Sequence, residues 1–387
     1  MASGMNSTAR SELGDFKPRV WVLADDRPGN STQSMGIAHE LDWPTEIKSL
    51  AFGPLSALHN GIVGSSVAGL KSASRATLCE PWPDLVIAAG GRTAPVARWV
   101  KSQSRGITRL VQLGRKGSNP AKHFDLSVSP SYARLSPHPN RMEVSLPLTN
   151  VSPESLAAAA AEWGEVFGAN SAPRVAVLVG GCTAKHRLDA KTAEQMGKEI
   201  GRMVHQAGGS VFVTTSRRTS NEAVAALERA LPKVAYFHKW SADASAANPY
   251  RGYLALADAL VVTDDSESML AEACATGKPI SIYPVPTRES TWPERLKEAM
   301  VERGAGKMPL GEPGTPKPQK GIELFFARLI EAGLLRPARD LDGMRQRLIE
   351  LGQAREFDGN LVLDQVPQLA DLQRVADRIR ELMGVGR

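Results

Sequence analysis

The stretch VVTDDSESMLAEACATGKP, residues 261–279, decides the fold class of this chain. Its apolar start predicts a buried strand, and the polar turn Asp264–Glu267 predicts the beginning of a helix. We expect the helix to end at Gly277, because glycine commonly ends helices and Pro279 cannot continue one. A strand that passes through a short polar turn into a helix is the repeating unit of parallel α/β sheets.

Short apolar runs of the same kind recur along the whole chain, and helix-like stretches separate several of them. They are Arg19–Asp26, Asp84–Gly90, Leu110–Gly114, Phe124–Pro130 and Met142–Leu148, followed by Arg174–Gly181, Ser210–Arg217, Val234–Trp240, Ala259–Ser266 and Pro279–Val285. Apolar runs without polar alternation are typical of strands that are covered on both faces. We therefore predict an α/β chain with two Rossmann-like domains, each built on a parallel sheet.

The length of 387 residues suits two domains of about 100–200 residues each. The segment LTNVSPE, residues 148–154, interrupts the strand and helix pattern and is the predicted linker. The predicted parts are a loose tail (1–18), an N-terminal domain (19–150), a C-terminal domain (151–320) and C-terminal helices (321–387).

Composition excludes several classes of protein. The hydrophobic content of 42% and charged content of 23% argue against a disordered chain. No run approaches the roughly 18 apolar residues of a transmembrane helix, and residues 1–18 lack the apolar core of a signal peptide. Three scattered cysteines argue against a disulfide framework or a cysteine-based zinc site. We expect a cytoplasmic location, either free or peripheral on the inner face of the cytoplasmic membrane.

The charge distribution points to anionic partners. Residues 85–124 contain no acid but eight bases, which are Arg92, Arg98, Lys101, Arg105, Arg109, Arg115, Lys116 and Lys122. Such a stretch attracts phosphate groups, anionic lipid or nucleic acid, although a solvated helix face gives the same pattern. Few aromatic side chains lie among these bases, which argues against nucleic acid. An anionic membrane surface is the partner that this stretch predicts.

The first strand ends in the polar loop DDRPGNSTQ, residues 25–33. Ligands of open parallel sheets bind beyond the carboxyl ends of the strands, so this loop is a candidate site. Asp25 or Asp26 would act as a general base on a hydroxyl group, while Arg27 and the following helix N-terminus would hold an anion. The alternative is a turn in which the two aspartates only cap backbone N–H groups.

Two strand ends in the second half carry phosphate-binding residue types. Gly180-Gly181 would let the backbone approach a phosphate, although tight turns also use such pairs. Ser216-Arg217-Arg218-Thr219 places adjacent guanidinium groups between hydroxyls, which suits a diphosphate because guanidinium groups bind phosphate through two hydrogen bonds. The alternative for the arginines is an exposed pair of surface charges.

The turn within 261–279 adds a further candidate site. Asp265 or Ser266 would cap the helix, and the free N–H groups near Ser268 would point at an anion. Glu272 has apolar neighbours in the helix, so it requires a partner, and ribose hydroxyls would supply one; a solvated glutamate is the alternative. The acids 264–265 also suit a divalent metal, but we expect none because the cap uses one of them. Upstream, Asn248-Pro249-Tyr250 forms either a purely structural turn or a contact with a nucleotide base.

These motifs, together with GGRTAP (residues 90–95) and NPYRGYLALAD (residues 248–258), resemble one family in their order along the chain. That family comprises bacterial glycosyltransferase-like proteins and the plant "elongated mitochondria" fission factors. The resemblance spans about residues 19–385. It implies a GT-B-like fold with two sheets facing a central cleft. In that fold the C-terminal half binds a nucleotide-sugar, the N-terminal half binds the acceptor, and the last helix crosses back onto the first domain.

Carried over to this chain, the resemblance and the motifs together give three sets of candidate residues. The catalytic set is Asp25, Asp26 and Arg27. The acceptor set is Gly29, Asn30, Gln33, Gly91, Arg92 and Thr93. The donor set is Gly180, Gly181, Ser216, Arg217, Arg218, Thr219, Asn248, Tyr250, Asp265, Ser266, Ser268, Met269 and Glu272.

The chain departs from the family pattern at two places. Asp26 replaces the glycine of the family's Asp-Gly-Arg-Pro-Gly, so either Asp25 or Asp26 would be the base. The family's His-Asp pair appears here as Ser131-Tyr132, which bears on activity and acceptor choice.

The resemblance implies a metal-independent glycosyltransferase without a cofactor, whose donor is a nucleotide-diphosphate-sugar. The acceptor would be a membrane lipid or a cell-envelope glycan precursor. The alternatives are a nucleotide-sugar epimerase of the same fold and a non-catalytic adaptor at a membrane surface. An NAD-dependent dehydrogenase is disfavoured, because no G-x-G-x-x-G follows any predicted strand.

Overall fold

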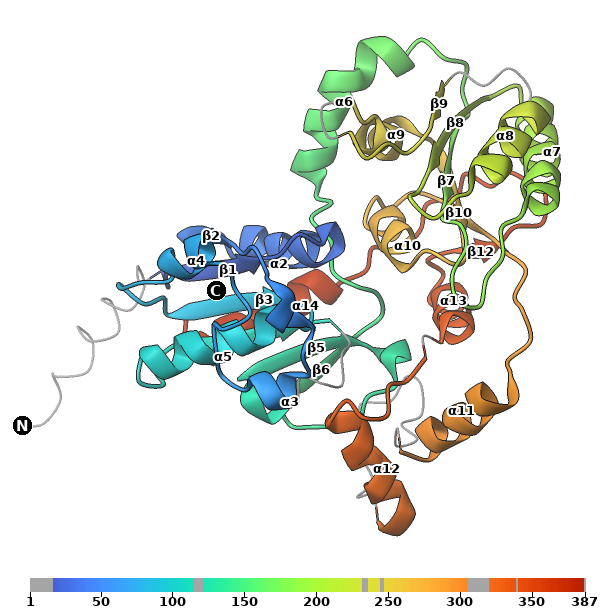
Figure 1. Ribbon diagram of the computed structural model, residues 1–387. Helices are drawn as coiled ribbons and strands as arrows, with labels where there is room; N and C mark the ends of the chain where they lie inside the picture. The colour runs from blue at the N-terminus through green and yellow to red at the C-terminus, as the bar shows by residue number, and fades with distance from the viewer. Residues whose placement is uncertain are drawn as a thin grey trace, which may run out of the picture. The chain divides into compact units, whose positions relative to one another are not determined.

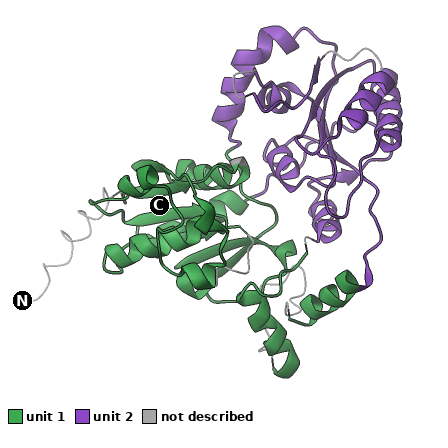
Figure 2. Ribbon diagram, in the orientation of Figure 1, with its two compact units in different colours: residues 1–150, 293–339, 370–387 green, residues 151–292, 340–369 purple. Residues whose placement is uncertain are grey.

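The structure, a computed structural model, describes residues 17–114, 121–231, 236–243, 247–304, 320–338 and 340–385. The chain forms two compact units, which Figure 2 distinguishes by colour. Unit 1 contains residues 1–150, 293–339 and 370–387, and unit 2 contains residues 151–292 and 340–369. The predicted tail lies outside the described residues except for Lys17 and Pro18.

Unit 1 is built on a parallel six-stranded sheet in the order β2-β1-β3-β4-β5-β6. Its strands are β1 (Val20–Ala24), β2 (Thr45–Ser49), β3 (Leu85–Ala89), β4 (Arg109–Leu113), β5 (Leu126–Pro130) and β6 (Arg141–Val144). The first five follow the flavodoxin-like order 2-1-3-4-5, in which the order of the parallel strands reverses between β1 and β3. The point beyond the carboxyl ends of these two strands is where open α/β sheets commonly bind ligands.

Helices cover both faces of the sheet of unit 1 (Figure 1). Helix α2 (Pro28–Leu41) packs on one face and α5 (Thr93–Gln103) on the other, each over buried apolar strand residues. The remaining described elements of this unit are η2 (Pro54–Ala57), α3 (Asn60–Val63), α4 (Ser72–Ala76), η3 (Ala121–His123), η4 (Ser131–Ala133), α11 (Trp292–Gly304), α12 (Gly321–Glu331) and α14 (Asp371–Met383). Most of α11 and all of α12 cluster with unit 1, although the sequence assigned residues 293–304 to the second domain.

The last helix, α14, packs on the first domain, as the resemblance implied. Val375, Ala376 and Ile379 are fully buried in the same core as α2. The Arg380 guanidinium donates a hydrogen bond to the carbonyl of Glu40 at 2.7 Å. Unit 1 is therefore completed by a segment that is distant from it in the sequence.

Unit 2 has a second parallel six-stranded sheet, in the order β12-β11-β10-β7-β8-β9. Its strands are β7 (Arg174–Val179), β8 (Ser210–Thr215), β9 (Tyr236–His238), β10 (Ala259–Thr263), β11 (Ile280–Tyr283) and β12 (Arg355–Glu356). Starting from β9, the strand order is the Rossmann order 3-2-1-4-5-6, and the order of the strands reverses between β7 and β10. The prediction of two Rossmann-like α/β domains with parallel sheets is confirmed.

In unit 2, α7 (Ala190–Gln206) and α8 (Asn221–Ala230) pack together over one face of the sheet (Figure 1). On the other face lie α6 (Pro153–Phe167) and α9 (Tyr250–Leu256), where Phe167, Phe212 and Tyr253 form an aromatic cluster. The unit also contains α10 (Glu267–Cys274), which follows β10, and α13 (Leu341–Glu350), which comes from the C-terminal part of the chain.

Candidate functional site

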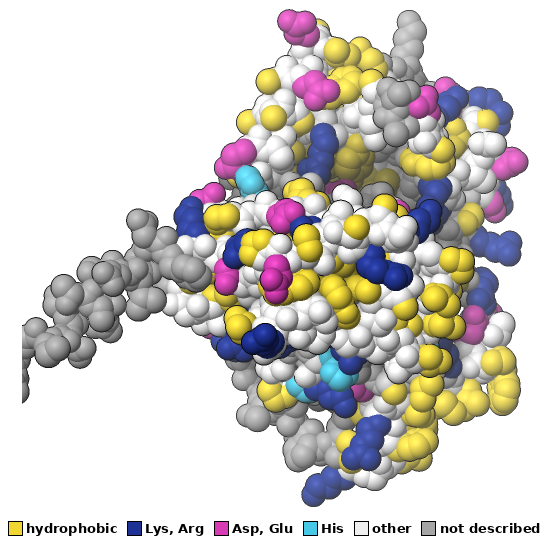
Figure 3. Space-filling view, turned by 60° about the vertical axis from the view of Figure 1, so that its left-hand side comes forward, with side chains coloured by type: hydrophobic (Ala, Val, Ile, Leu, Met, Phe, Trp, Pro, Cys, Tyr) yellow, Lys and Arg dark blue, Asp and Glu magenta, His cyan; other side chains and the backbone are white. Residues whose placement is uncertain are grey.

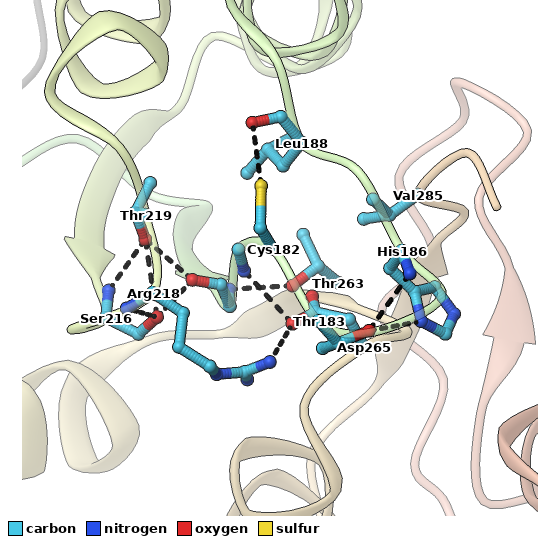
Figure 4. Close-up of polar contacts among 12 residues, drawn as sticks. Cys182, Thr183, His186, Leu188, Ser216, Arg218, Thr219, Thr263, Asp265 and Val285 are labelled. Atoms are coloured by element: carbon cyan, nitrogen blue, oxygen red, sulfur yellow. Dashed lines mark hydrogen bonds and ion pairs between the residues drawn. The ribbon is translucent and has the colours of Figure 1, made fainter. Parts of the chain in front are cut away.

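Three loops of unit 2 meet at the reversal of strand order between β7 and β10, and hydrogen bonds hold them together (Figure 4). After β7, the Gly180 N–H donates to Thr263 Oγ1 at 2.8 Å, and the Gly181 N–H donates to Asp265 Oδ2 at 3.0 Å. A Cβ atom at Gly180 would collide with the Asp265 carboxylate. Gly181 has φ +141° and lies against the backbone of Arg218. The paired glycines therefore permit the close approach of the three loops.

In the loop after β8, the hydroxyl groups of Ser216 and Thr219 form hydrogen bonds with the protein. Ser216 Oγ and Thr219 Oγ1 both donate to the carbonyl of Gly180, the latter at 2.6 Å. The Ser216 N–H donates to Thr219 Oγ1 at 3.0 Å, and the Arg218 N–H donates to Ser216 Oγ at 3.1 Å. These two side chains fix the shape of the loop and its contact with Gly180 (Figure 4).

The two adjacent arginines of this loop have different surroundings. Arg218 Nη1 lies 2.8 Å from Oδ2 of Asp265, whose side chain is fully buried. The Arg217 side chain is exposed and has no ion pair or hydrogen bond with the part of the chain that the structure describes. The predicted clamp of two arginines is thus divided between one that neutralises Asp265 and one that is free to bind an anion.

Helix α10 begins beside this loop cluster, at the end of β10. Ser266 is its N-cap residue in an extended conformation, and its side chain makes no capping hydrogen bond. The N–H groups of the first helical turn have no intrahelical partner and attract negative charge. Ser268 is exposed at this end of the helix, and the neighbouring Met269 is half-buried. The helix N-terminus is thus a candidate anion-binding element.

Glu272 lies one turn further along α10, on the same face as Ser268. Its carboxylate accepts a hydrogen bond from the hydroxyl of Tyr250, the first residue of α9. Burial raises the pKa of Glu272, and the Tyr250 hydrogen bond partly offsets this. Burial also raises the pKa of Tyr250. The partner that the sequence required for Glu272 is therefore present within the protein.

Asn248 has a local role in the same region. Its side-chain oxygen accepts a hydrogen bond from the N–H of Tyr250 at 3.1 Å, which fixes the turn that precedes α9. This contact agrees with the structural alternative for the Asn-Pro-Tyr turn.

A second polar cluster surrounds Asp264, next to the loop cluster. Asp264 Oδ1 accepts a hydrogen bond from the Val285 N–H at 3.0 Å and lies 4.0 Å from His186 Nε2. Arg345 Nη1 of α13 lies 3.8 Å from Oδ2. Burial raises the pKa of Asp264 to about 6 and lowers that of His186. Sequence reasoning missed Arg345, because no local pattern connects α13 with the end of β10.

Among the described residues, no group of three or more His, Cys, Asp or Glu side chains is arranged to hold a metal ion. Asp264 Oδ1 accepts the Val285 N–H and Asp265 Oδ2 accepts the Gly181 N–H, whereas Asp265 Oδ1 is buried and has no hydrogen-bond partner among the described residues.

In unit 1 the loops after β1 and β3 also meet where the strand order reverses. Asp25 is almost fully buried and accepts hydrogen bonds from the Arg27 N–H at 3.2 Å, Asn30 Nδ2 at 3.1 Å and Arg92 Nη2 at 3.0 Å. Arg92 also pairs with Asp26, and its guanidinium lies over the Phe52 ring. Arg92 is therefore the centre of this cluster.

These contacts bear on the predicted general bases. The hydrogen bond from Arg92 lowers the pKa of Asp26, which is exposed. Asp25 accepts three donors, one of them a backbone N–H group, which agrees with the capping alternative. Asp26 would have to separate from Arg92 before it could accept a proton efficiently, because a carboxylate held by a guanidinium is a weak base. Catalysis by Asp25 or Asp26 stays a prediction.

The other predicted acceptor residues of unit 1 differ in their exposure. Thr93 is fully buried and its hydroxyl donates to the carbonyl of Ala89 at 2.7 Å, so it stabilises the turn and is not available to a ligand. The carbonyl of Gly91 accepts a hydrogen bond from Asn60 Nδ2 at 2.7 Å. Gly29 is exposed, and its carbonyl accepts a hydrogen bond from Gln33 Nε2 at 2.9 Å.

The basic stretch 85–124 does not form one free cationic patch among the described residues. Lys101 and Arg109 both pair with Asp125, at 2.6 and 3.0 Å, and Arg92 pairs with Asp25 and Asp26. Arg115 and Lys116 lie outside the described residues. On the face drawn in Figure 3, Lys and Arg side chains are scattered among hydrophobic and uncharged ones.

The family model of mitochondrial fission ELM1 proteins matches residues 28–315, which is well over half of the chain. This chain belongs to the mitochondrial fission ELM1 family. All candidate donor residues of unit 2 fall inside the range that matches the ELM1 family, whereas Asp25, Asp26 and Arg27 directly precede it. The family resemblance inferred from the sequence is confirmed.

Two curated relatives are similar to this ELM1 family member. The Mitochondrial fission protein ELM1 of Arabidopsis thaliana is 27% identical over 266 residues, which are 63% of this chain and 61% of the plant protein. The chain thus spans about three fifths of that relative. The Uncharacterized protein RP120 of Rickettsia prowazekii is 24% identical over 316 residues, which are 73% of this chain and 88% of that protein.

Solved structures similar to this ELM1 family member include two sugar-nucleotide enzymes. One is the UDP-GlcNAc 2-epimerase of Methanocaldococcus jannaschii, with 12% identity, a TM-score of 0.45, and 81% of this chain and 98% of that chain covered. The other is the ADP-heptose heptosyltransferase II of E. coli, with 12% identity, a TM-score of 0.43, and 94% and 98% covered.

Proposed function

We propose that this protein is a metal-independent glycosyltransferase whose unit 2 binds a nucleotide-diphosphate-sugar. The observation that carries the proposal is the loop cluster at the reversal of strand order between β7 and β10. Hydrogen bonds join the Gly180-Gly181 backbone, the loop at 216–219 and the start of α10, and Arg217 has no ion pair with any residue that the structure describes. Such crevices beyond the carboxyl ends of strands are where open α/β sheets bind ligands.

The chemistry of this cluster suits a diphosphate. The N-terminus of α10 offers backbone N–H groups and the positive end of the helix dipole, and Arg217 offers a guanidinium group that binds phosphate through two hydrogen bonds. Because Arg218 already neutralises Asp265, the buried carboxylate does not repel a bound anion. The cluster therefore presents a net positive character to a ligand.

Glu272 and Tyr250 would bind the sugar of the nucleoside. They lie on the α10 face that continues from Ser268, and ribose hydroxyls satisfy a partly buried carboxylate well. In this assignment the phosphates lie at the start of α10 and the ribose lies one turn along it. Asn248 would fix the Tyr250 end of this subsite.

In the proposed reaction an acceptor hydroxyl attacks the anomeric carbon of the sugar, and the bond from that carbon to the diphosphate oxygen breaks. Arg217 and the α10 N-terminus would stabilise the negative charge that forms on the leaving diphosphate. The proton of the acceptor hydroxyl would pass to Asp25 or Asp26 of unit 1, once Arg92 has released that carboxylate. The acceptor class that we propose is a membrane lipid or an envelope glycan precursor.

A specific observation favours a second candidate, a non-catalytic protein that binds nucleotide-sugar and recruits a partner. Arg92 donates hydrogen bonds to both candidate general bases, Asp25 and Asp26. In this structure neither carboxylate is therefore free to accept a proton from a substrate. This candidate keeps the donor site of unit 2 but requires no acceptor chemistry. Only an assay of turnover therefore distinguishes this non-catalytic candidate from the transferase.

Thermal unfolding with a panel of nucleoside mono- and diphosphates and nucleotide-sugars tests the donor site. A ligand at about 100 times its dissociation constant adds about 2.7 kcal/mol of stability and raises the midpoint by a few degrees. We expect a shift with one base, lost in Arg217→Ala and Glu272→Ala. Arg202→Ala, an exposed arginine on α7, is the control.

No shift with any nucleotide would contradict the proposal for unit 2. Release of nucleoside diphosphate from the stabilising nucleotide-sugar in the presence of lipid extracts then separates the two candidates. Turnover supports the transferase, and tight binding without turnover supports the non-catalytic protein.

A further inference from the structure

The polar cluster around Asp264 contains buried atoms whose hydrogen-bonding capacity is not used. The side chains of His186 and Asp264 are only 6% and 8% exposed, and His186 Nε2 lies 4.0 Å from Asp264 Oδ1, which is too long for a hydrogen bond. Within the described part of the chain, neither His186 Nε2 nor Asp264 Oδ2 has a hydrogen-bond partner. Buried polar atoms normally have one, so the cluster lacks a group that would complete it.

Hydrogen bonds with Thr183 fix the tautomer of His186 (Figure 4). Thr183 Oγ1 accepts the backbone N–H of His186 at 2.9 Å and that of Lys185 at 3.3 Å. Because these two bonds use both acceptor positions of the hydroxyl, its O–H donates to His186 Nδ1 at 3.0 Å. Burial lowers the pKa of His186, so the ring is neutral at pH 7 and carries its proton on Nε2. His186 therefore directs a free N–H donor towards Asp264.

Arg345 of α13 adds a second donor to the cluster. Its guanidinium lies 3.8 Å from Asp264 Oδ2, 3.9 Å from Asp342 Oδ1 and 4.0 Å from Glu356 Oε1, so each contact is longer than a direct hydrogen bond. The three carboxylates balance the positive charge of Arg345 and would repel an anionic group of a ligand. The cluster is therefore suited to a neutral polar group.

A hydroxyl group is the neutral group that fits these three side chains. The cluster offers two donors, His186 Nε2 and Arg345 Nη1, and one free acceptor, Asp264 Oδ2. A hydroxyl accepts two hydrogen bonds and donates one, so it satisfies all three atoms. The gaps of 3.8 and 4.0 Å leave space for an oxygen at about 2.8 Å from the atoms on either side.

The cluster adjoins the proposed diphosphate site. Asp264 directly precedes Asp265, whose carboxylate binds the Gly181 N–H after β7 and Arg218 after β8. By contrast, Val285 and Arg345 approach Asp264 from the β11 side of the sheet, after β11 and from α13. A sugar attached to the diphosphate is the part of the ligand that would lie next to the loop cluster on this side.

We propose that His186, Asp264 and Arg345 bind one hydroxyl group of the sugar that is attached to the nucleoside diphosphate. This inference rests on the proposed function and deepens it, because it assigns the sugar end of the donor to its own part of unit 2. The hydroxyl oxygen accepts hydrogen bonds from His186 and Arg345 and donates one to Asp264. These three residues select among donor sugars, whereas Arg217 and the α10 N-terminus bind the phosphates that all such donors share.

Isothermal titration of the full chain, without any acceptor, separates the two parts of the ligand. The probes are UDP with UDP-glucose and UDP-N-acetylglucosamine, ADP with ADP-glucose, GDP with GDP-mannose, and dTDP with dTDP-glucose. In His186→Ala and Arg345→Ala we expect affinity for the bound nucleotide-sugar to fall about 5–30-fold, while affinity for its nucleoside diphosphate changes by less than about twofold. His186→Gln keeps an N–H donor and should bind the nucleotide-sugar within about threefold of wild type.

Arg347→Ala is the matched control. Arg347 lies on the same helix as Arg345 and has almost the same side-chain exposure, 28% against 29%, but it pairs with Glu350. Its replacement should leave both affinities unchanged. Arg345 makes no ion pair shorter than 3.8 Å among the described residues, so Arg345→Ala should fold, and its thermal midpoint checks this.

Monodeoxy analogues of the bound nucleotide-sugar identify the hydroxyl. The analogue that lacks it should bind wild type about 5–30-fold more weakly than the parent compound does. The same analogue should lose less in Arg345→Ala, because the two changes remove the same hydrogen bond. Equal losses in wild type and Arg345→Ala for every analogue would contradict the assignment.

Two further results would overturn the proposal. One is unchanged nucleotide-sugar affinity in both alanine variants, which would leave the cluster to a bound water. The other is an equal loss of affinity for nucleoside diphosphate and nucleotide-sugar, which would indicate a distorted site. Neither contradicts the donor site itself, as long as nucleoside diphosphate binding is lost in Arg217→Ala. Failure of wild type to bind any probe contradicts both this inference and the proposed function.

Discussion

Arg218 and Asp265 form an ion pair across two loops of unit 2, with Nη1 lying 2.8 Å from Oδ2. The Asp265 side chain is fully buried, and the same oxygen accepts the N–H of Gly181. Arg218 is thus the only described cation that pairs with this carboxylate. Because of this pair, we expect Arg218 to stabilise the loop cluster and Arg217 to bind the ligand.

Replacement of Arg218 by alanine tests this division. We expect Arg218→Ala to lower the free energy of unfolding by about 1–3 kcal/mol, because Asp265 would lose its charge partner while staying buried. The side chain of Arg218 is about one-third exposed, so the cost is below that of a fully buried pair. Urea unfolding measures the change. Arg217→Ala should keep wild-type stability; equal destabilisation by both variants would contradict the division of roles.

The close approach of the loops makes Gly180 sensitive to a single added methyl group. In Gly180→Ala the new Cβ would collide with the Asp265 carboxylate, so the loops must separate. We expect a loss of about 1–3 kcal/mol of stability, together with loss of nucleotide binding in the thermal-shift assay. Gly164→Ala on helix α6 is the matched control, because open space surrounds that position. Wild-type nucleotide binding by Gly180→Ala would contradict the assigned geometry.

The hydroxyl of Tyr250 and the carboxylate of Glu272 should contribute unequally to nucleotide affinity. Tyr250→Phe removes one hydrogen bond and keeps the ring, so we expect affinity to fall about 3–10-fold. Glu272→Gln removes the charge that would bind ribose hydroxyls, and we expect a larger loss, about 10–100-fold. Isothermal titration with the stabilising nucleotide measures both. A larger effect of Tyr250→Phe would indicate that Tyr250, and not Glu272, contacts the ligand.

Asp264 makes the stability of unit 2 depend on pH. Its pKa of about 6 in the folded state exceeds the ordinary value of 3.8, so the folded protein binds this proton more tightly than the unfolded chain. The stability that this group contributes is present below pH 3.8 and is lost as the pH rises towards about 6, by about 1–3 kcal/mol in total.

The variant Asp264→Asn isolates this contribution. It keeps an oxygen that can accept the Val285 N–H but does not titrate, so the decline of stability between about pH 4 and 6 should become shallower. Urea unfolding across this range is the measurement. A slope identical to that of wild type would show that Asp264 is not the source of this pH dependence.

Most of the strands that sequence analysis identified are interior strands covered on both faces, and two, β6 and β9, lie at sheet edges. RVAVLV of β7 and ALVVT of β10 are continuous apolar runs, because helices lie over both sides of the sheet. The two strands that it missed lie at sheet edges. TEIKS of β2 is mostly exposed and polar, and β12 consists of two residues only. These two strands bury too little apolar surface to leave a hydrophobic pattern in the sequence.

The sequence predicted where the residues of the candidate site lie, but it did not predict which side chains pair with one another. Strand ends located Gly180, Ser216 and Asp265, because the carboxyl ends of parallel strands share one edge of the sheet. The partners depend on side-chain directions that only the folded chain defines. Arg92 is 67 residues from Asp25, and Arg345 is far from Asp264, so no spacing in the sequence joins them.

The last helix supports unit 1 through apolar packing, and Ile379 is its most direct test. Ile379 is fully buried with Val375 and Ala376 against α2, so alanine at this position leaves a cavity that the sheet and α2 cannot fill. We expect Ile379→Ala to cost about 2–5 kcal/mol in urea unfolding. Arg378→Ala on the exposed side of the same helix is the control and should change stability by about 0.5 kcal/mol or less. Since α14 belongs to unit 1 and not to unit 2, the midpoint shift that nucleotide induces in the thermal assay should persist in Ile379→Ala. Loss of that shift would show that unit 2 depends on α14 for its folding.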